Sequence, residues 1–125
     1  MTYRILITGS RAWNDYNKVS KVLTAEVAAA IKLGLDVVVV HGDCPTGADA
    51  ITQRLCEEMS IITERHPADW SKHGRAAGPL RNQEMVDLGA DICYAYSLPE
   101  SRGTKDCKAR AEKAGIPVVE LGMVE

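Results

Sequence analysis

The chain has 125 residues, of which 46% are hydrophobic and 26% charged, and its formal net charge is −2 with a pI near 5.9. This balance excludes a disordered chain, and the length is that of one domain. The acidic pI argues against a protein that coats duplex DNA, because such binding depends on neutralising phosphates. No apolar run approaches the ~20 residues of a membrane span, and no signal peptide is visible. The four cysteines form no CxxC pair, so we expect free thiols in the cytoplasm.

Short apolar runs alternate with helical patterns along the chain. Apolar runs bounded by turn residues predict strands over residues 3–8, 36–41, 61–65, 91–96 and 117–121. Apolar residues at helical spacing predict helices over about 19–31 and 48–59, from between 75 and 79 to about 88, and over 104–114. The segment 66–73 has no apolar period and is expected to be a loop.

This alternation predicts the fold. Strands that alternate with helices form a parallel sheet with helices on both faces, so we expect a single α/β, doubly wound, Rossmann-like domain of three layers over residues 1–125. The crossovers should be right-handed, and the expected strand order is 3-2-1-4-5. Ligands of such sheets bind outside the carboxyl ends of the strands, so the residues after each strand are the candidates for a site.

The first strand is followed by Gly9, Ser10 and Arg11. Gly9 permits a tight turn and a close approach to a ligand, while Ser10 and Arg11 offer a hydroxyl and a cation. The segment is not GxGxxG, so the standard dinucleotide motif is absent. An ordinary turn between a strand and a helix is the competing interpretation.

The second strand leads into a loop that contains His41, Gly42, Thr46 and Gly47 and opens a helix. The free N–H groups at a helix start favour anions, and Thr46 is a candidate cap. Asp49 lies in the first helical turn. It is either a functional acid or a residue that complements the helix dipole.

The third loop is locally basic. Residues 65–81 hold four Arg or Lys and two His but only one acid, Asp69, which suggests an anionic small ligand. We expect Arg81 to grip a phosphate and to contribute little to the stability of the free protein. Trp70 either covers a base or anchors the loop.

After the fourth strand, Ser101, Gly103 and Thr104 lie at a helix start and form a second candidate phosphate nest. The spacing of the His and Cys residues matches no ordinary zinc site, and no GxSxG nucleophile elbow is present. We therefore expect neither a metal nor a further cofactor.

Taken together, these segments resemble the YspA-type, YpsA-related family of the SLOG (Smf/DprA–LOG) superfamily. The resemblance runs from Ile5 to Val119. It is carried by Gly9-Ser10-Arg11 with Trp13, His41-Gly42 with Gly47-Ala48-Asp49, His66-Pro67-Ala68-Asp69-Trp70, Ala77-Gly78-Pro79-x-Arg81-Asn82-x-x-Met85, and Ser101-x-Gly103-Thr104.

The resemblance implies a Rossmann-like domain that binds a nucleotide or nucleotide derivative, as in ligand sensors of phage and bacterial conflict systems. It also makes a homodimer plausible. The expected ligand-binding residues are Gly9, Ser10, Arg11, His41, Gly42, Gly47, Trp70, Arg81, Asn82, Ser101, Gly103 and Thr104.

One departure concerns catalysis. The LOG phosphoribohydrolases carry a glutamate three residues after the Gly-Thr pair, and here that position is Cys107. Asp106 precedes it by about 100° of helix rotation and is expected to face elsewhere. Asp49 and Asp69 are the candidate replacements for the missing acid.

Three functions follow from the sequence. The first is binding or sensing of a nucleotide-like ligand at the carboxyl edge of the sheet. The alternative is an enzyme that hydrolyses the N-glycosidic bond of a nucleoside monophosphate, which needs a fixed acid. A single-stranded DNA-binding module like Smf/DprA is disfavoured, because the chain lacks a basic balance and has few aromatic residues for stacking.

Overall fold

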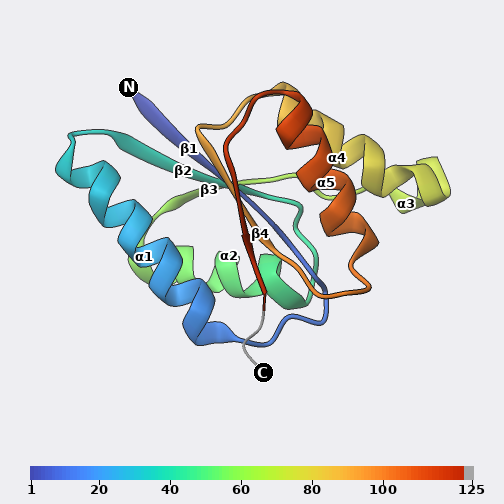
Figure 1. Cartoon of the computed structure of the whole chain (residues 1–125), viewed down its shortest axis with the longest axis horizontal. Helices are drawn as coiled ribbons and strands as arrows, with labels where there is room; N and C mark the ends of the chain where they lie inside the picture. The colour runs from blue at the N-terminus through green and yellow to red at the C-terminus, as the bar shows by residue number, and fades with distance from the viewer. Residues whose placement is uncertain (123–125) are drawn as a thin grey trace.

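Five parallel strands in the order β3-β2-β1-β4-β5 form the sheet of the computed structural model, which describes residues 1–122 (Figure 1). The strands are β1 (Thr2–Gly9), β2 (Asp36–His41), β3 (Ile62–Arg65), β4 (Ile92–Tyr96) and β5 (Val118–Leu121). The predicted strand order and parallel pairing are confirmed. Residues 123–125 of the expected domain lie outside the described residues.

Helices cover both faces of this sheet. They are α1 (Tyr16–Lys32), α2 (Gly47–Met59), α3 (Trp70–His73), the 3-10 turn η1 (Gly74–Ala76), α4 (Ala77–Asp87) and α5 (Arg102–Lys113). Helices α1 and α2 lie together on one face, and α4 and α5 lie together on the other (Figure 1). The predicted three-layer α/β arrangement is thereby confirmed. Among these helices, none is both long and apolar enough to cross a bilayer.

The alternation of side chains along the strands divides the core into two parts. Ile5 and Ile7 of β1 are fully buried against α1 and α2, whereas Leu6 between them is buried against α4 and α5. Val39 and Val40 of β2 divide in the same way. Both faces of the central strands are covered, which is why these strands read as continuous apolar runs.

The prediction of a loop over residues 66–73 is wrong for residues 70–73, which form α3. The carboxylate of Asp69 accepts a hydrogen bond from the Lys72 backbone N–H at 3.1 Å and caps this short helix. Four residues are too few to show an apolar period, so the sequence pattern carries no sign of the helix. Helix α4 then begins at Ala77, within the predicted range of 75–79, and this start places Pro79 in the first turn.

The carboxyl end of the sheet gathers the loops that the sequence singles out. The Ser10 backbone N–H donates to the Tyr96 carbonyl at 2.9 Å, which joins the ends of β1 and β4. The Ala48 N–H at the start of α2 donates to the Ser10 carbonyl at 3.2 Å. The segment after β1 is therefore fixed between its two neighbouring connections.

Candidate functional site

A cavity of about 850 Å³ opens at this edge of the sheet, between the end of β1, the loop after β2, the α3–α4 segment and the start of α5. Its volume falls in the range of about 300–1,000 Å³ that is usual for small-ligand sites. Eleven of the predicted site residues line it: Gly9, Ser10, Arg11, Gly42, Asp49, Trp70, Arg81, Asn82, Ser101, Gly103 and Thr104. The structure thus brings together residues that are far apart in the sequence.

The start of α5 lines this cavity and has hydrogen-bond donors without acceptors. Within residues 1–122, the backbone N–H groups of Gly103 and Thr104 have no acceptor. The Thr104 hydroxyl is also without a partner there, although the residue is only 2% exposed. A Cβ atom added at Gly103 would meet no atom within 4 Å, so the space beside this turn is open. Free amides at the positive end of a helix dipole are suited to an anion.

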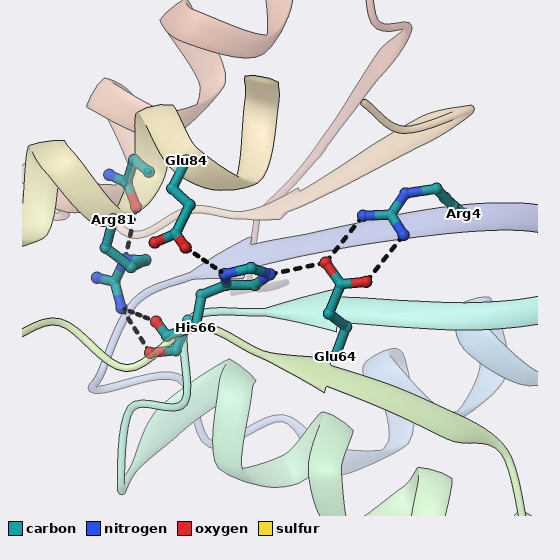
Figure 2. A network of polar contacts seen from close by, with 7 residues as sticks. Arg4, Glu64, His66, Arg81 and Glu84 are labelled. Atoms are coloured by element: carbon teal, nitrogen blue, oxygen red, sulfur yellow. Dashed lines mark hydrogen bonds and ion pairs between the residues drawn. The ribbon is translucent and has the colours of Figure 1, made fainter. Parts of the chain in front are cut away.

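Arg81 does not extend freely into the cavity. Its Nη1 donates to the Gly42 carbonyl at 2.5 Å and to the His66 carbonyl at 3.4 Å, and its Nε donates to Asn82 Oδ1 at 2.9 Å (Figure 2). The guanidinium therefore joins α4 to the loops that follow β2 and β3. The prediction that Arg81 contributes little to the stability of the free protein disagrees with this geometry. Its three hydrogen bonds, to Gly42, His66 and Asn82, are made within the protein itself.

A polar network extends from the same point toward β1. The ring of His66 lies between Glu64 and Glu84, with Nε2 at 2.8 Å from Glu64 Oε1 and Nδ1 at 3.5 Å from Glu84 Oε1 (Figure 2). Glu64 also accepts two hydrogen bonds from Arg4, at 2.9 and 3.0 Å. The Arg4 hydrogen bonds, with help from His66, outweigh burial and lower the pKa of Glu64 to about 2.

Asp49 is a buried acid in the wall of the cavity. The residue is 5% exposed; its Oδ2 accepts from the Cys44 N–H at 3.3 Å, while Oδ1 has no partner among the described residues. Burial raises the pKa of this carboxyl, against the opposing effects of His41 and of the Cys44 amide. A neutral carboxylic acid can donate a proton, which is the property a general acid needs.

On α5, the prediction that Asp106 faces away from the site is wrong. Asp106 lies at the cavity, and Cys107 lies in the core. Cys107 is fully buried in the core with Met85 and Ala111, and burial raises the pKa of its thiol to about 11. Asp106 lines the cavity. The spacing of Thr104, Cys107 and Ala111 is the buried stripe of the helix, and it leaves Asp106 beside Gly103 on the neighbouring face. Asp106 is therefore the acid that sequence reasoning missed, and this apolar spacing could have identified it.

Three predicted residues do not reach the cavity. His41 uses both ring nitrogens within the protein, since Nδ1 accepts from the Asp43 N–H at 3.0 Å and Nε2 lies 2.8 Å from Gln53 Oε1. Gly47 packs against the backbone of Ser10 and Arg11. Asp69 is exposed and caps α3, where the Ser71 hydroxyl and the Lys72 amide lower its pKa.

Trp70 lines the cavity and remains 48% exposed. The Arg11 guanidinium lies 5.3 Å from the centroid of its ring, in cation–π geometry. Gly78 also lies against Trp70, since an added Cβ would come within 3.3 Å of the ring. This placement gives Trp70 an anchored position with a part of its surface still available to a ligand.

The charged lining of the cavity consists of four arginines, Arg11, Arg75, Arg81 and Arg102, and three carboxyl groups, Asp49, Glu100 and Asp106. Arginine side chains therefore outnumber carboxyl groups in the lining of the cavity. No cluster of three or more metal-ligating side chains of His, Cys, Asp or Glu is found among residues 1–122.

A family model described as "YspA, cpYpsA-related SLOG family" matches residues 3–73 of the chain. The chain is 47% identical over 124 residues to the Gene 61 protein of Mycobacterium phage D29. The aligned region covers 95% of this chain and 96% of that protein. Two crystal structures of the C-terminal domain of a Pyrococcus furiosus hydrogenase share the fold, with TM-scores of 0.52 and 0.51 and identities of 16% and 15%. They cover 95% and 94% of this chain, and 91% and 89% of those chains.

Proposed function

The chain belongs to the YspA, cpYpsA-related SLOG family, and on that premise we propose that it binds a nucleotide or nucleotide derivative in the cavity at the carboxyl end of the sheet. The proposed ligand carries at least one phosphate. We place this activity in the cytoplasm, where Cys44, Cys56, Cys93 and Cys107 would stay free thiols.

The start of α5 is the observation that carries this proposal. The amides of Gly103 and Thr104 and the buried Thr104 hydroxyl lack partners within the described residues. For the buried hydroxyl the missing hydrogen bond is costly unless a ligand supplies it. A phosphate supplies acceptors for all three. The exposed part of Trp70 supplies a surface on which a base can stack.

Thr104→Val tests the phosphate contact. Valine keeps the shape of threonine and replaces an unpartnered hydroxyl with a methyl group, so the free protein should lose little stability. The loss of one hydrogen bond to a charged group should weaken binding of a nucleoside monophosphate by about 1.5–3 kcal/mol. Calorimetric titration with AMP, GMP, CMP and UMP measures this change.

Thr52→Val is the matched control. The Thr52 hydroxyl is also buried and unpartnered among residues 1–122, but Thr52 lies on α2 and does not line the cavity. Binding should be unchanged in this variant. Equal binding by the wild type and Thr104→Val would contradict the proposed phosphate contact.

A second candidate function is hydrolysis of the N-glycosidic bond of the bound nucleotide. The buried carboxyl of Asp49, with its raised pKa and free Oδ1, favours this candidate because bond cleavage needs an acid near the glycosidic nitrogen. Incubation with nucleoside monophosphates and chromatography of the free base tests it. Turnover that disappears in Asp49→Asn while binding remains would establish the enzyme, and no base release by the wild type would exclude it for these substrates.

A further inference from the structure

The carboxylate of Asp106 is held rigidly from one side. Its Oδ2 accepts hydrogen bonds from Asn82 Nδ2 at 3.0 Å and from Arg110 Nε at 2.9 Å. Arg110 is itself fixed, since its Nη1 donates to Gln83 Oε1 at 2.7 Å. Asn82 is buried and also donates to the Gly103 carbonyl at 3.3 Å. Residues of α4 and α5 thus fix where this carboxylate lies.

The second oxygen of Asp106 remains available. Oδ1 has no hydrogen-bond partner within residues 1–122, the side chain is 31% exposed, and the residue lines the cavity. Burial alone would raise the pKa of this carboxyl, but the bonds from Arg110 and Asn82 outweigh it and lower the pKa. At neutral pH the group is therefore an acceptor only.

The position of Asp106 relative to the start of α5 limits what it can contact. Asp106 is three residues after Gly103, so the two positions are neighbours on the same side of α5, about 5–6 Å apart. A carboxylate so close to a bound phosphate repels other phosphate oxygens. It attracts hydroxyl donors, and a nucleotide carries these on the sugar to which its phosphate is attached.

We propose that Asp106 is the residue that recognises the sugar, by accepting a hydrogen bond from a ribose hydroxyl, and that the cavity therefore prefers ribonucleotides to deoxyribonucleotides. This inference rests on the proposed nucleotide binding. It adds to that proposal the sugar class of the ligand and the residue that selects it.

Calorimetric titration tests the inference with AMP, GMP, CMP and UMP, their 2′-deoxy forms and their 3′-deoxy forms, in buffer with EDTA. For the wild type, removal of one of the two hydroxyls should weaken binding about tenfold or more, as for a bond to a charged acceptor. Asp106→Ala should weaken the ribonucleotide by a similar factor and leave that deoxy form nearly unchanged. Asp106→Asn, which lacks the charge, should show an intermediate preference.

Asp36→Asn is the matched control, because it removes the same charge from an exposed position at the start of β2 that does not line the cavity. Its sugar preference should equal that of the wild type. The melting temperature of each free variant reports whether it is folded, and the preference of the wild type is informative even if Asp106→Ala does not fold.

Three outcomes would overturn the inference and leave the proposed nucleotide binding in place. Equal binding of ribo and both deoxy forms by the wild type would remove the preference. An equal loss of affinity for all forms in the Asp106 variants would make Asp106 a structural residue. A preference that appears only when Mg²⁺ replaces EDTA would assign Asp106 to a bridging cation. If no nucleotide of either sugar binds the wild type, the proposed function fails and this inference fails with it.

Discussion

Arg81 donates to the loops that follow two different strands, and its guanidinium also lies against the Cα of Gly42, where an added Cβ would be 2.4 Å from Nη1. The absence of a side chain at Gly42 is therefore what admits the arginine. Arg81, which the sequence predicts as a phosphate ligand, links α4 in the free protein to the two loops that border the cavity.

Arg81→Ala should accordingly destabilise the protein in the absence of any ligand. The Gly42 carbonyl, the His66 carbonyl and the Asn82 amide oxygen each lose a charged donor, and we expect a loss of about 1–3 kcal/mol in the free energy of unfolding. Urea denaturation measures it. Arg54→Ala, where the side chain is 75% exposed, is the control and should change stability by less than about 0.5 kcal/mol. Equal stability of the two variants would contradict the structural role of Arg81.

The acids of the site show what can be predicted residue by residue. Asp49 is predictable as a candidate because it follows a strand at the ligand edge, but its burial depends on how α2 packs. The prediction that Asp106 faces away from the site is wrong, because it rests on aligning Cys107 with the LOG glutamate. The buried spacing of Thr104, Cys107 and Ala111 corrects that error, and it is present in the sequence.

At the scale of elements, the loop after β1 packs closely against the start of α2. Gly47 has a φ of +75°, and a Cβ added there would lie 2.1 Å from the Ser10 carbonyl oxygen. Left-handed backbone and close approach thus both require glycine at the start of α2. The glycines of this loop predict a ligand-binding segment. At Gly47, however, glycine is required by the packing against Ser10.

Gly47→Ala should therefore cost more stability than Gly34→Ala. Gly34 has nearly the same φ, +77°, but an added Cβ would meet no atom within 4 Å, so its substitution reports the backbone strain alone. We expect about 1 kcal/mol for Gly34→Ala and clearly more for Gly47→Ala. Chemical denaturation of both variants measures the difference, and equal losses would show that the contact with Ser10 relaxes freely.

The pair between Arg4 and Glu64 connects β1 with β3, on opposite sides of β2. Because the pKa of Glu64 is lowered to about 2 from 4.5, the unfolded chain binds more protons than the native protein between these pH values. This contribution to stability is present above about pH 4.5 and is lost as the pH falls toward 2.

Glu64→Gln should make stability less dependent on pH in this acidic range. Urea midpoints at pH 6, 4 and 3 should fall less in the variant than in the wild type, since the variant has no proton to bind at this position. The same fall in both proteins would contradict a stabilising pair at Glu64.

Elements differ in how far the sequence specifies them. The strands could be predicted because both faces of the sheet are covered, so the buried runs of β1 and β2 stand out. Helix α3 could not, because it rests on a single cap at Asp69 rather than on an apolar face. Helix α5 begins at Arg102, two residues before its expected start, and this shift places Gly103 within its first turn.

At the scale of the whole molecule, the site exists only where the fold brings the connections together. The switch-point rule locates the ligand edge beside β1, and the strand order confirms that β2 and β4 flank it. The rule cannot tell which groups remain free once the chain is packed. His41 and Arg81 use their polar atoms within the protein, whereas the start of α5 does not.

The central claim is that the cavity binds a nucleotide through its phosphate. The most direct measurement compares the melting temperature of the wild-type protein with AMP, GMP, CMP and UMP against that with the corresponding nucleosides at equal concentration. A ligand that binds the native state raises the melting temperature by mass action. The account predicts a larger rise for at least one monophosphate than for its nucleoside, and equal shifts across every pair would contradict it.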